Sequence, residues 1–148
     1  LGPVTELRTI SDAVGFVETA LDRDVAAPPL PGTTELQRGS LWAYSYGGAQ
    51  NVSFNLRGAP GSAPHGNRSS LTFGYGDELD FGLGCGGEVD PDPIDLAGIP
   101  AVVDSSSGMH QVIWPATMEK RNGTHSVYGY GYKESELIEI ARSMASSP

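Results

Sequence analysis

The end of the chain, from His110 to Met144, constrains the fold most, because strand patterns and a helix pattern follow each other there. The last apolar residues share one stripe of a helix, since they recur at i, i+3, i+4 and i+7: Leu137, Ile140, Ala141 and Met144. A short helix with one apolar stripe needs a sheet to cover. The segment therefore predicts the closing unit of an α+β domain, with one helix laid on an antiparallel sheet.

Two strand-like runs supply that sheet, at residues 111–114 and 126–132. The segment between them contains Asn122 followed by Gly123, and an Asn-Gly step is a strong hairpin-turn signal. We therefore predict that the two runs pair as antiparallel neighbours directly before the closing helix.

The second run alternates tyrosines with glycines, which places Tyr128, Tyr130 and Tyr132 on one face. Glycines within a strand usually mean that another backbone or helix approaches closely, so we expect the closing helix over the glycine face. Packing is the preferred interpretation of the tyrosines, and an exposed binding ladder is the alternative.

A helix is also predicted near the start of the chain, over residues 9–21, from a stripe of four apolar residues: Ile10, Val14, Val17 and Leu21. Thr9 or Ser11 is expected to cap its start. The proline-rich passage at residues 28–32 cannot be helical, and we interpret it as a rigid connector to the sheet. A proline-rich ligand for the aromatic groove of a partner is the alternative.

Short strands are expected through the middle of the chain, separated by turn residues: 41–46, 51–56, 71–75, 79–83, 94–96 and 100–103. Residues 57–70 are the longest stretch without a strand or helix pattern, and loops of this length are usually functional or mobile. For a chain of 148 residues we expect one domain, residues 1–148, of the α+β class. Its antiparallel sheet should contain about six to eight short strands, with an N-terminal and a C-terminal helix packed on it.

The chain is acidic, because 9 Lys and Arg residues stand against 18 Asp and Glu residues and give a formal net charge of −9. Non-specific binding to nucleic acid or to an anionic membrane requires a basic surface, so neither partner is expected. No run approaches the roughly 20 apolar residues of a transmembrane helix, so we do not expect this segment to insert into a membrane.

Cys85 is the only cysteine, so the chain forms no internal disulfide. A nucleophilic thiol needs a histidine base nearby, and the three histidines are far from it in sequence: His65, His110 and His125. A small buried side chain is the preferred interpretation. A hydrolase or transferase that uses Cys85 and a histidine is the alternative.

The densest group of carboxylates, Asp90, Asp92 and Asp95, lies in a proline-stiffened segment. Such oxygens suit calcium, but the glycine and the glutamate that complete an EF-hand loop are missing. A solvated acidic strand edge is the preferred interpretation, and a calcium-dependent adhesion module is the alternative. The chain has no P-loop, dinucleotide fingerprint or Gly-x-Ser-x-Gly elbow, so we expect no cofactor and no enzymatic activity.

Three segments match the Asn-x-Ser/Thr acceptor pattern for N-glycosylation, and they begin at Asn51, Asn67 and Asn122. The pattern has meaning only in a secretory setting. Asn67 and Asn122 fall in expected loops, as acceptors should, whereas Asn51 begins an expected strand.

The order of these segments resembles a known family. An opening helix, the Pro-Pro-Leu-Pro-Gly passage, short strands, residues 96–101, a strand ending at Trp114 and residues 136–144 follow one another. This order is similar to that of a bacterial family of extracytoplasmic domains of unknown function, found in lipoproteins and in anti-sigma-factor-like membrane proteins. The resemblance implies an α+β fold, a location outside the membrane and no established catalytic residues. Lys133 stands where family members often have a serine cap for the last helix.

We therefore expect a non-enzymatic extracytoplasmic domain, secreted or anchored to the cell envelope, that acts through contacts with a protein partner or with itself. A sensor, an envelope lipoprotein-like module and a surface-assembly subunit all fit this expectation. Two aromatic strand faces are the candidate binding surfaces: Trp42, Tyr44 and Tyr46 on one strand, and the three tyrosines of the closing unit on the other.

Overall fold

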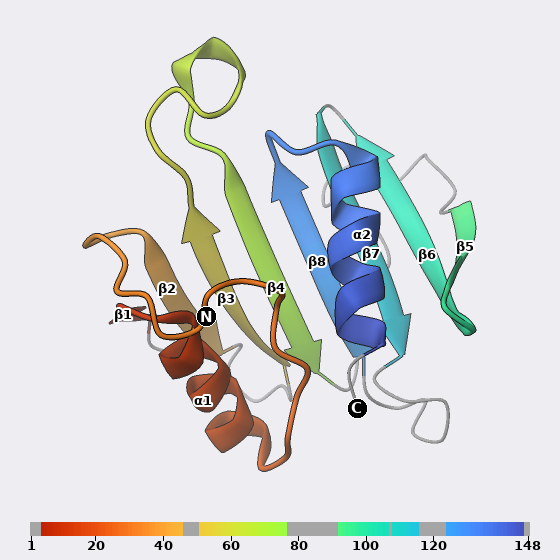
Figure 1. Ribbon diagram of the computed structural model, residues 1–148, viewed down its shortest axis with the longest axis horizontal. Helices are drawn as coiled ribbons and strands as arrows, with labels where there is room; N and C mark the ends of the chain where they lie inside the picture. Colours follow the sequence, from red (N-terminus) through yellow and green to blue (C-terminus); the bar gives the residue numbers. More distant parts are fainter. Residues whose placement is uncertain (1–3, 46–50, 77–91, 107, 116–123, 147–148) are drawn as a thin grey trace.

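The computed structural model describes residues 4–45, 51–76, 92–106, 108–115 and 124–146 (Figure 1). In chain order its elements are β1 (Val4–Leu7), α1 (Ile10–Leu21), β2 (Leu41–Ser45), β3 (Asn51–Arg57), the 3-10 turn η1 (Pro64–Gly66), β4 (Ser70–Gly76), β5 (Asp92–Leu96), β6 (Ile99–Ser106), β7 (Met109–Pro115), β8 (Thr124–Tyr130) and α2 (Glu134–Ala145). The strands form one eight-stranded sheet, with every neighbouring pair antiparallel. The predicted fold class, an antiparallel sheet with an N-terminal and a C-terminal helix, is confirmed.

The strand order is β1-β2-β3-β4-β8-β7-β6-β5, so each half of the chain contributes four strands that neighbour one another in sequence order. The two halves meet at the centre, where β4 pairs with β8 and Phe73 lies opposite Val127. The predicted pairing of the two runs before the closing helix is confirmed, because β7 and β8 are antiparallel neighbours.

Both helices lie on the same face of the sheet, α1 over β1–β3 and α2 over β5, β7 and β8 (Figure 1). A row of buried side chains crosses the sheet on that face, one from each of five neighbouring strands: Ala43, Phe54, Phe73, Val127 and Val112. The Phe54 and Phe73 rings stack with their centroids 5.1 Å apart. Burial of this row beneath the two apolar helix stripes is the main source of stability.

The closing helix approaches the sheet at a glycine, as the alternation of tyrosine and glycine predicted. A Cβ atom placed on Gly129 would lie 2.8 Å from Cδ2 of Leu137, which is fully buried. A side chain at this position would therefore force the Leu137 side chain to move. The glycine is what allows the first turn of α2 to rest directly on β8.

The opening helix begins as expected, since Thr9 is the N-cap and its hydroxyl accepts from the backbone N–H of Asp12 at 3.1 Å. The connector that follows is tied to its neighbours at two points. The backbone N–H of Ser11 donates to the carbonyl of Gly32 at 2.9 Å, and the Tyr75 hydroxyl donates to the carbonyl of Ala26 at 3.0 Å. This passage therefore packs along the protein as a connector.

Two elements differ from the sequence expectations. Strand β1 was not predicted, because its four residues are too short a run to show a period. Tyr132 lies beyond β8, because Gly131 adopts a φ of +83° and turns the chain toward α2. The prediction that Tyr132 belongs to the strand was therefore wrong. The strand expected at residues 79–83 lies outside the described residues.

Candidate functional site

The two aromatic strands predicted as separate binding surfaces lie on one face of the sheet. Gly129 faces α2, and its cross-strand neighbours Leu71, Leu56 and Leu41 share that face. Trp42, the next residue along β2, therefore points to the opposite face, on which neither of the described helices lies. We call this surface the helix-free face.

Trp42 and Tyr128 lie in the same cross-strand row of the helix-free face. Between them stand Asn55 on β3 and Thr72 on β4. Three strand spacings separate the two aromatic residues, which is about 14 Å at about 4.8 Å per strand. Tyr44 and Tyr130 point to the same face from the neighbouring rows, since each is two residues further along its strand. The described members of both predicted sets on β2 and β8 are thus brought together.

The polar atoms of this face are partly satisfied within it. The indole N–H of Trp42 donates to the carbonyl of Gly39 at 3.2 Å, and the amide of Asn55 donates to the Thr72 hydroxyl at 2.8 Å. The Tyr128 hydroxyl donates to the sulfur of Met109, and partial burial raises the pKa of that phenol. The four aromatic rings are half-buried, and each combines an apolar body with a polar end. Tyr46 lies outside the described residues.

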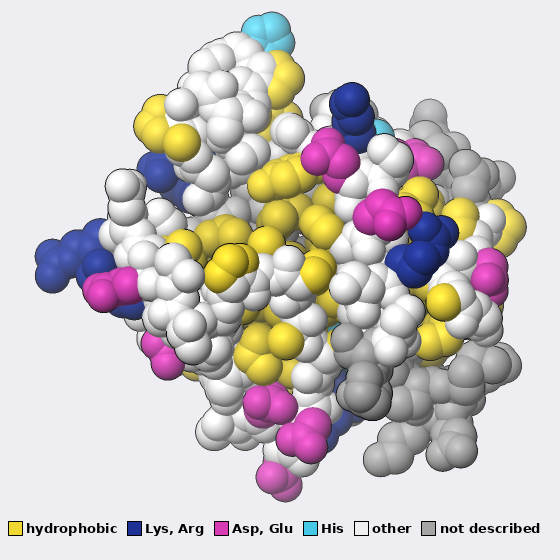
Figure 2. Space-filling model, viewed as in Figure 1, with side chains coloured by type: hydrophobic (Ala, Val, Ile, Leu, Met, Phe, Trp, Pro, Cys, Tyr) yellow, Lys and Arg dark blue, Asp and Glu magenta, His cyan; other side chains and the backbone are white. Residues whose placement is uncertain are grey.

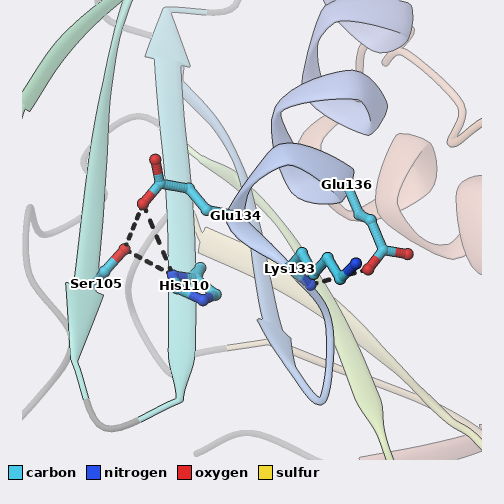
Figure 3. Close-up of polar contacts among 5 residues, drawn as sticks. All are labelled: Ser105, His110, Lys133, Glu134 and Glu136. Atoms are coloured by element: carbon cyan, nitrogen blue, oxygen red, sulfur yellow. Dashed lines mark hydrogen bonds and ion pairs between the residues drawn. The ribbon is translucent and has the colours of Figure 1, made fainter.

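A polar cluster joins the β6–β7 hairpin to the start of α2 (Figure 3). The Ser105 hydroxyl oxygen lies 2.6 Å from Nδ1 of His110, its cross-strand partner, and donates to Oε2 of Glu134 at 2.9 Å. His110 Nδ1 lies 3.9 Å from the same carboxylate oxygen. Sequence reasoning missed this cluster, because Ser105 and Glu134 are 29 residues apart and match no catalytic spacing.

The single hydroxyl proton of Ser105 decides what the cluster does chemically. The Ser105 hydroxyl donates to Glu134, and the direction of its second hydrogen bond, to Nδ1 of His110, depends on the imidazole tautomer. In a nucleophilic triad the imidazole accepts the serine proton and the carboxylate orients the imidazole. Here the carboxylate lies against the serine oxygen, where it opposes the negative charge that develops during attack. The arrangement is suited to holding α2 on the hairpin and not to activating a serine.

The start of α2 is held in two further ways. Glu134 is the first residue of the helix, where the helix dipole favours a carboxylate. Lys133 occupies the N-cap position, and its backbone N–H donates to Oε1 of Glu136 at 2.9 Å (Figure 3). Glu136 thus supplies the glutamate half of a capping box although the N-cap is not a serine.

His125 is a buried histidine on the helix-facing side of β8. Its ring stacks on Trp114 with centroids 5.6 Å apart and meets the edge of Tyr75 at 5.0 Å. Neither ring nitrogen has a hydrogen-bond partner among the described residues. Burial, and then the nearby positive charge of Arg23, lowers the pKa of His125 from 6.5 to about 4. His125 is therefore a neutral aromatic core residue near pH 7.

The carboxylates proposed for calcium are only partly described. Asp95 accepts from the backbone N–H of Gly98 at 3.1 Å, which is a turn contact within the β5–β6 hairpin. Asp92 is the first residue of β5, and Asp90 lies outside the described residues. Within the described ranges no group of three or more His, Cys, Asp or Glu side chains lies close enough to hold a metal ion. Cys85, the candidate nucleophile, also lies outside them.

The glycosylation acceptors differ in their setting. Asn67 is exposed in the loop between β3 and β4, and its amide nitrogen donates to the Tyr130 hydroxyl at 3.1 Å. Asn51 is the first residue of β3, and its buried amide oxygen has no partner among the described residues. Asn122 lies outside the described residues.

In the described part of the chain, no helix has the length and apolar character needed to cross a membrane. No family model, curated protein or solved structure matches this chain.

Proposed function

We propose that this protein is a non-enzymatic extracytoplasmic domain that acts through protein contacts made by its helix-free face. The observation that carries the proposal is the strand register, which places Trp42, Tyr44, Tyr128 and Tyr130 on the sheet face opposite the two described helices. Tyrosine and tryptophan contribute large contact areas at protein interfaces and lose little rotamer entropy on binding.

The neighbouring side chains suit the same role. Asn55, Thr72 and Gln111 lie in the row of Trp42 and Tyr128, so amide and hydroxyl groups flank the aromatic rings. The amide oxygen of Gln111 is buried and has no partner among the described residues. The placement outside the membrane rests on the family resemblance of the sequence.

Replacement of the aromatic residues is expected to remove partner binding without unfolding the protein. Tyr128→Ser with Tyr130→Ser shortens two half-buried side chains that lie on the opposite face from the two helices. We expect the double variant to keep its circular dichroism spectrum and to lose, by about tenfold or more, retention of a discrete protein from an envelope fraction of the native source.

Phe16→Ser is the matched control, because Phe16 is also half-buried but lies on α1, on the other side of the sheet. Phe16→Ser should lower the free energy of unfolding and leave retention of the partner protein unchanged. Equal retention by the wild type and by the tyrosine variant would refute the proposed function.

A further inference from the structure

The loop between β3 and β4, residues 58–69, projects beyond the end of the sheet (Figure 1). It was expected to be a functional or mobile stretch. In the structure it is organised by its own hydrogen bonds. Gly58 N–H donates to the carbonyl of Ser69 at 2.8 Å, and Ser69 N–H donates to the Ser62 hydroxyl oxygen at 2.9 Å. Ala63 N–H donates to the carbonyl of Asn67 at 3.0 Å, which closes the tip.

Two contacts fix this loop on the end of β8. The amide of Asn67 donates to the Tyr130 hydroxyl, so the loop is joined to the helix-free face. A Cβ atom on Gly131 would lie 2.9 Å from the Cβ of Ala63, which shows how closely the loop packs against the segment after β8. A loop held this way loses little conformational entropy when it binds a partner.

Three arginines surround the base of the loop. Arg57 is the last residue of β3, and its backbone N–H donates to the carbonyl of Ser40 at 2.8 Å. Arg38 is two residues before Ser40, so the backbone at Arg38 lies near Arg57. Arg68 reaches back across the loop, and its Nε donates to the carbonyl of Gly58 at 2.8 Å. This bond fixes the Arg68 side chain and leaves its two terminal nitrogens as donors.

None of these three arginines forms an ion pair with an acidic side chain of the described residues, although the chain has twice as many acidic as basic residues. Elsewhere, Arg8 pairs with Glu35 and Arg142 pairs with Glu139. Residues 57–70 contain no Asp or Glu. In Figure 2 the loop rises at the upper left, with histidine at its tip, basic colour at its base and no acidic colour on it. The loop is thus a local basic site on an acidic protein.

We propose that this loop, with Arg38, Arg57 and Arg68, recognises a carboxylate-bearing segment of the protein partner. Guanidinium groups bind carboxylates through paired hydrogen bonds, and the bond from Nε of Arg68 to Gly58 leaves both terminal nitrogens of Arg68 to make such a pair. Salt screens charges beyond about 8 Å, so the distant negative charges of the protein have little effect at the loop. The nearby arginines therefore determine which charge the loop attracts. The inference rests on the proposed function, because Tyr130 belongs to both surfaces.

The test measures fluorescence anisotropy of a labelled polyglutamate peptide with the wild-type protein at increasing salt concentrations. We expect binding at low salt that weakens as salt rises, and a loss of about tenfold or more in Arg57→Gln with Arg68→Gln. Arg142→Gln is the control, since it removes one positive charge from a partly exposed arginine that is paired with Glu139, and it should bind as the wild type does.

An Arg68→Lys variant separates charge from geometry, because it keeps the charge and loses the planar fork, and it should bind more weakly than the wild type. Equal weakening by Arg142→Gln, or tighter binding to polyphosphate or to phosphatidylglycerol vesicles than to polyglutamate, would overturn the inference. The proposed function fails in a different experiment: it is refuted if the Tyr128→Ser, Tyr130→Ser variant still retains the partner.

Discussion

Lowering the pH from 7 to 4 is expected to destabilise the protein by about 3 kcal/mol through His125 alone. Burial between Trp114 and Tyr75, and then the charge of Arg23, lowers the pKa of this imidazole from 6.5 to about 4. An unfolded chain therefore takes up the proton first as the pH falls. The stability loss begins near pH 6.5, grows down to about pH 4 and is constant below that value.

The measurement is the free energy of unfolding by urea at several pH values, for the wild type and for His125→Phe. Phenylalanine keeps a flat ring in contact with Trp114 and Tyr75 and has no nitrogen to leave unpaired. The carboxylates titrate in both proteins, so the difference between the two isolates His125. As the pH falls from 6.5 to 4, we expect the free energy of unfolding of the variant to rise relative to that of the wild type. A difference that is constant with pH would contradict the neutral buried state.

The second large effect is expected at the contact between α2 and β8. Leu137→Ala should lower the free energy of unfolding by about 2–5 kcal/mol, because a fully buried side chain is removed over a glycine. Gly129→Ala should cost about 1–3 kcal/mol, because its methyl group would lie 2.8 Å from Cδ2 of the fully buried Leu137 and would force that side chain to move.

The double variant Gly129→Ala with Leu137→Ala distinguishes this contact from general damage. The new methyl group occupies part of the space that Leu137 leaves, so the double variant should be more stable than the sum of the single losses predicts, by about 0.5–3 kcal/mol. Urea unfolding of the four proteins measures this coupling. Additive losses would show that α2 does not rest on Gly129.

The closing unit was predictable because each of its signals is local. The apolar period of α2 and the alternation of tyrosine and glycine on β8 act over a few residues each, and the helix was correctly placed over the glycine face. The Asn-Gly step at residues 122–123 lies outside the described residues. The opening helix and its Thr9 cap were predictable for the same reason.

The features that sequence reasoning missed depend on contacts between distant segments. Strand β1 exists because β2 offers it an edge to pair with, and its own four residues show no pattern. The cluster of Ser105, His110 and Glu134 arises only when α2 returns over the β6–β7 hairpin. The environment of His125 likewise comes from β4 and β7.

The candidate binding face was predictable within each strand but not across the sheet. The sequence pointed to the aromatic residues on β2 and on β8 as two surfaces, because alternation shows only which residues share a face within one strand. Their union depends on β3 and β4 lying between them with Asn55 and Thr72 in register. That register is a property of the whole sheet.

The most direct test of the central claim is site-specific photo-crosslinking in cells of the native source. A photo-reactive amino acid would replace Tyr128 on the helix-free face and, in a separate protein, Thr19, which is exposed on α1. The account predicts one discrete protein adduct from position 128 and none from position 19. Adducts from position 19 alone, or equal adducts from both positions, would contradict a partner-binding role for the helix-free face.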